Sequence, residues 1–411
     1  MTTKHVVAAL LALGMSGAIA LEARAQSTDD LFNNRVVQEI RLTINSRTLS
    51  DMREDFQSSE YHTADFQWRN IRLRNIGMRM RGVGSRNPVK LGLRIDFNRY
   101  TKGQEFLGLK SIVLDNHWQD GTFLHEFLTM ALYARLGYPA PRIAYCRLYI
   151  NNESQGLYSI VESVDNKFLS RTIGESDGYL FSFQHRRDYL GEYLGHDLEP
   201  YKELFEAQNH EKEADTILYA PIHDLFREIN QPLDGVWRDR VGRLLDLEQF
   251  TIQSAFEAYI AELDGVNGAF GMNNFFLYRS LDSTRHRLFL WDKDSAFEAI
   301  EYDIFFNRDK YQLLQRVLSF GDLRELYLRT LEDAARSAAE LPEDDEDRSG
   351  QSWLEREINR VVTLISGEVR ADARKSFTTE EFLDAVEYLK EFARRRPTFV
   401  LKEVNRARQA R

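Results

Sequence analysis

The stretch 264–297 constrains the fold of this chain more than any other part of the sequence. It contains two apolar runs, residues 275–278 and 288–291, which a short polar turn separates. Apolar runs of this length joined by a polar turn are typical of a β-hairpin. The sequence therefore predicts two paired strands, and the residues just before the first strand and just after the second lie at the same end.

Acidic and amide side chains stand at that end of the predicted hairpin. Asp264 lies in the Gly/Asn-rich loop before the first strand, Asn274 directly precedes that strand, and Asp292 directly follows the second. Carboxylate and amide oxygens bind Mg²⁺ and can position a hydroxyl group. The three residues form a candidate metal and catalytic cluster. The alternative is structural, because the same residue types form turns and cap strands.

The N-terminus predicts export. Lys4 precedes an apolar run, residues 6–21, which ends in Ala-Arg-Ala at residues 23–25. This is the pattern of a signal peptide that is cleaved before Gln26. A retained membrane anchor is the weaker alternative, because the run is short and small residues interrupt it. We therefore expect a periplasmic or secreted protein with no transmembrane anchor in the mature chain.

The charge of the chain argues against binding to nucleic acid. The net charge is −10 at pH 7, and removal of residues 1–25 takes away Lys4, Arg24 and Glu22, which makes it −11. An acidic protein gains no general attraction to a phosphate backbone. The sole cysteine, Cys146, excludes an intrachain disulfide. The fold must therefore depend on its apolar core.

Two regions of different pattern follow a polar leader at residues 26–35. Residues 36–165 alternate between apolar and polar over several short runs and contain one helical pattern at 122–136, which predicts a β-rich N-terminal lobe with one main helix. Residues 166–411 are mostly helical in pattern and carry the hairpin 264–297. This order of parts predicts an α+β fold, namely a bilobal atypical protein-kinase-like fold with a mostly helical C-terminal lobe.

The predicted β-rich lobe carries residues that suit a phosphate ligand. Gly82 and Gly84 allow phosphates to approach the backbone N–H groups of their loop, and Lys90 can bridge phosphate groups. The standard kinase signatures G-x-G-x-x-G, H-R-D and D-F-G are absent. The kinase prediction therefore depends on the order of the parts.

Four blocks of the sequence resemble the spore coat protein H (CotH) kinase-like family. They are Met80-Arg-Gly-Val-Gly-Ser85 with Lys90, Leu148-Tyr-Ile-Asn-Asn-Glu-Ser-Gln-Gly-Leu-Tyr158 with Glu162, Asp264-Gly265 with Asn273-Asn-Phe-Phe-Leu-Tyr278, and Leu290-Trp-Asp-Lys-Asp-Ser-Ala-Phe297. A late run, Arg394-Arg-Arg-Pro-Thr-Phe-Val400, is similar to the closing helix of that family. The sequence departs from the family at Val83-Gly84, where Asn-Ser is usual, and at His125, where the family often has Arg.

The resemblance implies an atypical kinase that transfers phosphate from ATP, with Mg²⁺ or Mn²⁺, to serine or threonine of a protein outside the cytoplasm. It also implies a role for each matching residue. The predicted site consists of catalytic Asp264 and Lys90, cofactor-binding Lys90, Arg81, Ser85 and Glu162, and metal-binding Asn274 and Asp292. Glu126, on the predicted helix, could form an ion pair with Lys90.

Three alternatives use the same residues. A non-catalytic envelope or surface-assembly pseudokinase would keep the scaffold in order to bind a partner. A nucleotidyl transferase would use the same metal ligands with the nucleotide reversed. A divalent-metal site without nucleotide would need only the acids and the amide.

Overall fold

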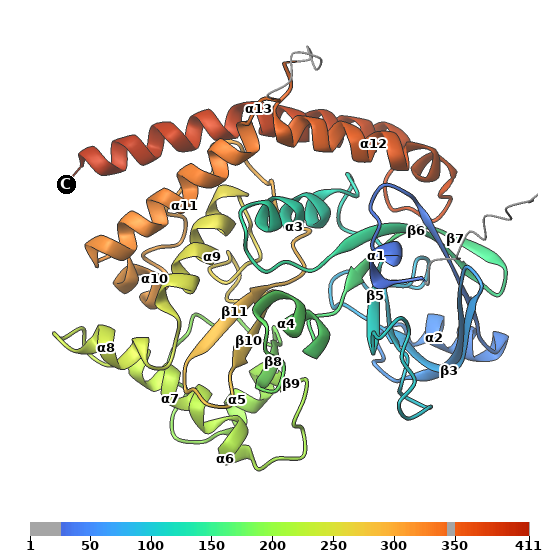
Figure 1. Cartoon of the computed structure of the whole chain (residues 1–411), viewed down its shortest axis with the longest axis horizontal. Helices are drawn as coiled ribbons and strands as arrows, with labels where there is room; N and C mark the ends of the chain where they lie inside the picture. Colours follow the sequence, from blue (N-terminus) through green and yellow to red (C-terminus); the bar gives the residue numbers. More distant parts are fainter. Residues whose placement is uncertain (1–25, 343–349, 411) are drawn as a thin grey trace, which may run out of the picture.

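The computed structural model describes residues 26–342 and 350–410 of the chain, which fold into a mixed α+β structure (Figure 1). The predicted signal peptide at residues 1–25 and the acidic loop at 343–347 lie outside the described residues. No helix within the described ranges is long and apolar enough to cross a membrane.

Seven strands close into a barrel, in the order β1-β2-β3-β4-β5-β7-β6. The bounds are β1 (Gln38–Thr43), β2 (His62–Trp68), β3 (Ile71–Met80), β4 (Leu93–Asp96), β5 (Ser111–Asp115), β6 (Ile143–Ile150) and β7 (Glu153–Glu162). The strands pair antiparallel except for β1 and β6, which pair parallel and close the barrel. The sequence predicted strands in this region but not a closed barrel.

The alternating pattern of the strands fills the inside of the barrel. Ile76, Met78 and Met80 on β3 are buried, as are Leu93 and Ile95 on the neighbouring β4. Because successive side chains of a strand point to opposite faces, this alternation puts one apolar face of each strand inside. These residues belong to a core that is separate from the core of the helical part.

A second sheet of four strands, in the order β11-β10-β8-β9, lies in the helical part. Its strands are β8 (Tyr179–Phe183), β9 (Phe205–Ala207), β10 (Phe275–Arg279) and β11 (His286–Leu290). Strands β10 and β11 form the predicted hairpin. The segment 185–245 folds mostly into short helices, and its aromatic residues Tyr189, Tyr201 and Phe205 are buried.

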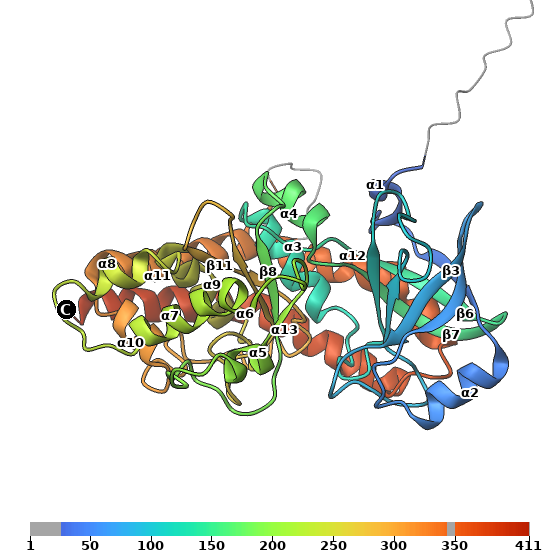
Figure 2. The same cartoon turned by 90° about the horizontal axis from the view of Figure 1, so that it is seen from below.

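Thirteen helices lie within the described ranges. They are α1 (Thr28–Leu31), α2 (Ser46–Glu54), α3 (His125–Arg135), α4 (Asn166–Ile173), α5 (Glu199–Leu204), α6 (Asp215–Leu218), α7 (Ala220–Ile229), α8 (Trp237–Gly242), α9 (Leu247–Tyr259), α10 (Gln312–Val317), α11 (Gly321–Ala339), α12 (Trp353–Ala371) and α13 (Thr379–Gln409). Seen from below, the barrel lies at one end of the molecule, the second sheet lies nearer the middle, and α8, α10 and the C-terminus lie at the other end (Figure 2). Helix α12 contacts both β7 of the barrel and α3.

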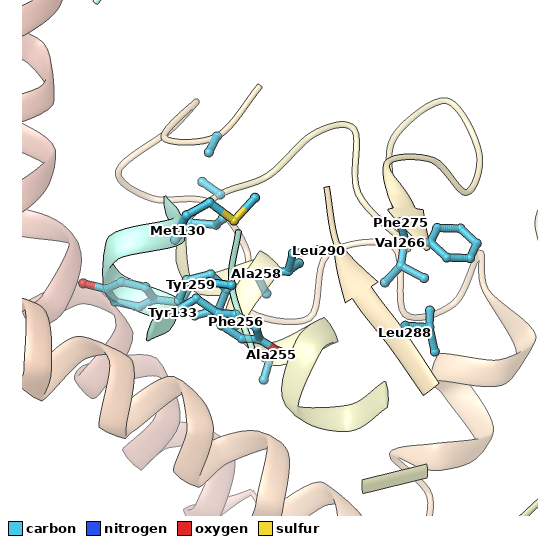
Figure 3. Packing of buried hydrophobic residues seen from close by; sticks show 14 of the residues in the cluster. Met130, Tyr133, Ala255, Phe256, Ala258, Tyr259, Val266, Phe275, Leu288 and Leu290 are labelled. Carbon is cyan, nitrogen blue, oxygen red and sulfur yellow. The ribbon is translucent and has the colours of Figure 1, made fainter. Parts of the chain in front are cut away.

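Helix α3, the predicted helix of the β-rich region, packs on the outside of the barrel. Its side chains Met130 and Tyr133 meet α9 and the β10–β11 hairpin in one apolar core (Figure 3). The Tyr133 and Phe256 rings lie 4.6 Å apart between centroids. Gly137 follows the helix with φ 85°, the left-handed conformation that ends many helices. The packing fixes α3, and with it Glu126, relative to the hairpin.

Candidate active site

The hairpin brings Asn274 and Asp292 to one end of the second sheet. Phe275 on β10 pairs with Leu290 on β11, and the backbone N–H of Trp291 donates to the carbonyl of Asn274 at 3.2 Å. Asn274 and Asp292 have φ values of 54° and 49°, which few residues other than glycine adopt. The backbone therefore turns sharply at both positions as it leaves the paired strands.

Asp264 lies against this end of the hairpin. Its Oδ2 accepts hydrogen bonds from Nδ2 of Asn273 at 3.0 Å and from Nδ2 of Asn274 at 3.1 Å. Burial raises the pKa of Asp264, although the bond from Asn273 and the charge of Lys293 oppose the shift. Because Asn274 directs its amide nitrogen to Asp264, its amide oxygen remains available to a cation.

Arg81 joins the barrel to the hairpin. It follows the last residue of β3, and its guanidinium binds Asp292 at 2.8 Å and also binds Asp115, the last residue of β5. Burial alone would lower the pKa of Arg81, but Asp292, Asp115 and Glu126 together raise it. A residue of the predicted nucleotide-binding block is thus in direct contact with a predicted metal ligand.

The carboxylates around Arg81 outnumber it. Burial raises the pKa of Glu126, the second residue of α3, well above its usual value, and the charges of Asp292 and Asp115 raise it further. The pKa of Asp294 is raised in the same way. Oε1 of Glu126 is buried without a hydrogen-bond partner. The cluster therefore holds more acidic groups than cations, and a bound cation would lower the pKa of Glu126 and Asp294 and favour their charged forms.

The chemistry of these donors fits a divalent cation. Asp292 uses one oxygen for Arg81 and has a side chain 24% exposed, and Asn274 offers an amide oxygen beside it. Among the described residues, no three His, Cys, Asp or Glu side chains form a metal cage by themselves. Mg²⁺ commonly uses one or two carboxylates together with substrate phosphates and water, so two protein ligands suffice.

A buried charged group lies beneath the Asp264 loop. Lys293, fully buried, binds Oε1 of Glu257 at 3.1 Å and donates to the carbonyl of Asn274 at 3.1 Å. The carboxylate of Glu257 accepts from the backbone N–H of Val266 at 2.8 Å, and that of Glu262 accepts from the N–H of Asp264 at 2.7 Å. These contacts hold the loop at both of its ends.

Lys90 forms a different ion pair from the one that the sequence suggested. Its Nζ binds Oδ2 of Asp372, which directly follows α12, at 2.7 Å, and both side chains are buried. The suggested ion pair between Lys90 and Glu126 is not formed, because Asp372 takes the ammonium group and Arg81 is the cation whose charge acts on Glu126. The role of Lys90 in catalysis and phosphate binding stays a prediction.

The loop that follows Arg81 is folded on itself. The side chain of Arg86 donates to the carbonyl of Gly82 at 2.6 Å, and Asn116 donates to the carbonyl of Ser85 at 3.1 Å. Gly82 has φ 79°, and a Cβ there would lie 2.3 Å from Oγ of Ser85. Ser85 is buried in this turn, and its part in nucleotide binding stays a prediction.

Glu162, at the end of β7, has its carboxylate fully engaged. It is 2% exposed and binds Arg142 at 2.8 Å and Arg171 at 2.5 Å. Any contact with adenine here would therefore come from the backbone of this segment. That role also stays a prediction.

Sequence reasoning missed several residues of the site. A sequence pattern could have indicated Asp115, because it is an acid directly after the apolar run of a strand. Another could have indicated Lys293, because it is a lysine between two aspartates. No pattern indicated Asp372, because it meets Lys90 across 282 positions of sequence. His125, a departure from the family pattern, places Nδ1 2.8 Å from the carbonyl oxygen of Asp294.

Comparison with known proteins agrees with the sequence resemblance. The CotH kinase protein family matches residues 78–400, which include every predicted site residue. Inner spore coat protein H of Bacillus subtilis (strain 168) is 21% identical over 306 residues, which cover 72% of this chain and 81% of that protein.

Two solved structures also align with the chain at low similarity. A chain of the Shewanella oneidensis MR-1 toxin–antitoxin complex of HipA, HipB and operator DNA has a TM-score of 0.41 and 14% identity, with 90% of this chain and 74% of that chain covered. The Helicobacter pylori proinflammatory kinase CtkA has a TM-score of 0.31 and 12% identity, with 79% and 94% covered. On the match over residues 78–400, this chain belongs to the CotH kinase protein family.

Proposed function

We propose that this protein is an exported atypical kinase that transfers the γ-phosphoryl group of ATP to serine or threonine hydroxyls of a secreted or envelope protein. Membership of the CotH kinase family supports a kinase-like function. The signal-peptide pattern of residues 1–25 supports export. One relative is named for the inner spore coat, which is consistent with work outside the cytoplasm.

One observation carries the proposal: Asp264, Asn274 and Asp292 meet at one end of the hairpin, and Arg81 of the barrel contacts Asp292. Asn274 and Asp292 would hold Mg²⁺ or Mn²⁺, which would offset the charge of the phosphates. The excess of carboxylates over Arg81 provides the electrostatic reason for a cation at this place.

Each residue of the site would then have its own role in the transfer. Asp264 would orient the acceptor hydroxyl and receive its proton while the hydroxyl oxygen bonds to the γ-phosphorus and the bond to the β–γ bridging oxygen breaks. Asn273 and Asn274 hold the Asp264 carboxylate in place by donating hydrogen bonds to it. Arg81 keeps Asp292 in place and closes the site on the side of the barrel.

Transfer of label from ATP tests the proposal. The protein is incubated with Mg²⁺ or Mn²⁺ and with ATP labelled in either the α- or the γ-phosphate, and acceptor proteins from the culture supernatant and envelope of the source cell are added. Asp264→Ala should abolish transfer. Asp282→Ala is the matched control, because Asp282 is exposed in the turn at the other end of the hairpin.

Each result selects one function. Metal-dependent transfer of γ-label that is lost in Asp264→Ala supports the kinase. Transfer of α-label identifies nucleotidyl transfer. ATP binding without transfer of either label would indicate a pseudokinase scaffold, and metal binding without ATP binding would indicate a divalent-metal site.

A further inference from the structure

The loop that follows Asp264 is held rigidly along one side by the segment before α10. Nδ2 of Asn307 donates to the carbonyls of Asn267 at 3.0 Å and Gly268 at 2.8 Å. The Tyr311 hydroxyl donates to the same Gly268 carbonyl at 2.8 Å. Lys310 extends the contact one residue further along the loop. The loop backbone is therefore fixed as far as residue 269.

The segment 185–189 holds the other side of this loop. Nε2 of His185 lies 3.2 Å from the carbonyl oxygen of Phe270, and the N–H of Met272 donates to the carbonyl of Tyr189 at 2.7 Å. Gly271 has φ 112°, and a Cβ there would lie 2.8 Å from the backbone nitrogen of Tyr189. The two segments thus lie side by side with no room for a side chain at position 271.

On this fixed backbone, the Phe270 side chain is 62% exposed. A single exposed aromatic residue is common on protein surfaces and carries no function by itself. The neighbouring segment adds two positive charges, because Arg186 and Arg187 are both exposed. Within residues 26–342 and 350–410, neither guanidinium has an ion-pair or hydrogen-bond partner.

In a chain with a net charge of −10, where many arginines are bound to carboxylates, these two leave positive charge available in the segment that contacts the Phe270 loop. The loop also begins at the proposed catalytic group: the N–H of Ala269 donates to the carbonyl of Leu263 at 2.7 Å, and Nδ2 of Asn273 donates to Oδ2 of Asp264 at 3.0 Å. Phe270 thus belongs to the rigid loop that Asp264 begins, and Arg186 and Arg187 belong to the segment that contacts this loop.

We propose that Phe270, Arg186 and Arg187 form the acceptor-recognition surface of the kinase. The acceptor is a polypeptide with an apolar side chain close to the reactive serine or threonine, which packs on Phe270, and with a carboxylate next to it, which pairs with the two guanidinium groups. This inference rests on the proposed function, since it assumes that a hydroxyl is phosphorylated beside Asp264.

Peptide specificity tests this surface. Three serine peptides share a leucine near the serine and differ only in the adjoining charged position, which is aspartate, alanine or lysine, and a fourth has glycine in place of the leucine. Exposed ion pairs are individually weak, so two arginines should favour the aspartate peptide over the lysine peptide by about tenfold in kcat/KM. In the double variant Arg186→Glu/Arg187→Glu this preference should reverse.

Two further variants complete the test. Phe270→Ala should remove the preference for leucine over glycine and leave the KM for ATP unchanged. The matched control is Arg72→Glu/Arg74→Glu, which changes the net charge equally at exposed arginines of β3 and should keep the wild-type preferences.

Three results would overturn the inference in different ways. Equal kcat/KM for all four peptides would contradict the acceptor surface and leave the kinase proposal standing. A rise in the KM for ATP without a change in peptide preference would assign the arginines to the nucleotide. If the wild-type protein transfers phosphate to none of the peptides and to no other acceptor, both the proposed function and the acceptor surface are wrong.

Discussion

Nη2 of Arg81 lies 2.8 Å from Oδ2 of Asp292, although the two residues are 211 positions apart in the sequence. Arg81 comes from the barrel and Asp292 from the hairpin of the second sheet. The same guanidinium also binds Asp115. This contact places the barrel loop and the end of the hairpin that carries Asp292 in one candidate site.

Arg81→Ala should destabilise the protein strongly. The substitution leaves the buried Asp115 and the partly buried Asp292 without their cation, and loss of one partner of a buried ion pair costs about 3–5 kcal/mol. Thermal or urea unfolding would measure the loss, and Arg81→Lys should recover part of it because it keeps the charge. Added Mg²⁺ should raise the Tm of Arg81→Ala more than that of wild type. An unfolding free energy equal to that of wild type would contradict the account.

The variants Lys90→Met and Asp372→Asn test whether Lys90 serves only in a structural ion pair or also contacts phosphate. If Lys90 only ties the barrel to the end of α12, both substitutions should lower the unfolding free energy by about 3–5 kcal/mol, and the double variant should lose less than their sum. ATP affinity, measured where each variant is folded, should then be equally unaffected. A loss of ATP affinity in Lys90→Met but not in Asp372→Asn would support phosphate contact.

Glu262 should make stability depend on pH. Burial raises the pKa of Glu262 from the ordinary 4.5 to about 7, with Glu257 adding to the shift and Lys293 opposing it. Because the pKa in the folded protein is raised, the stabilisation is complete below about pH 4.5 and is lost as the pH rises through 7. The shift corresponds to about 3 kcal/mol.

The variant Glu262→Gln removes this titration and can keep the hydrogen bond from the N–H of Asp264. Its unfolding free energy should therefore rise relative to wild type by up to about 3 kcal/mol between pH 5 and pH 8. Glu298→Gln, at an exposed position, is the control and should follow wild type throughout. A constant difference between Glu262→Gln and wild type over this range would show that Glu262 does not titrate there.

Local patterns predicted the hairpin and its neighbouring helix because their determinants lie within a few residues. The Asp246 side chain accepts from the N–H of Gln249, three residues on, and starts α9. The same helix ends at Tyr259. Ala261 has φ 53°, and no glycine marks the position.

Long-range contacts could not be predicted in this way. Barrel closure depends on the parallel pairing of β1 with β6. The ion pair of Lys90 with Asp372 joins residues that are 282 positions apart in the sequence. In neither case does the local sequence of one partner indicate the other. The role of Asp115 depends equally on where β5 ends relative to Arg81, which the fold alone determines.

The most direct measurement is calorimetric titration of ATP into the protein with and without Mg²⁺, in wild type, Asp292→Ala and the control Asp282→Ala. The account predicts binding that requires the metal, that is lost in Asp292→Ala and that is retained in Asp282→Ala. Metal-dependent binding of ATP that survives in Asp292→Ala would contradict the assignment of the metal site to this end of the hairpin. No binding of ATP by the wild-type protein with either Mg²⁺ or Mn²⁺ would contradict the proposed kinase.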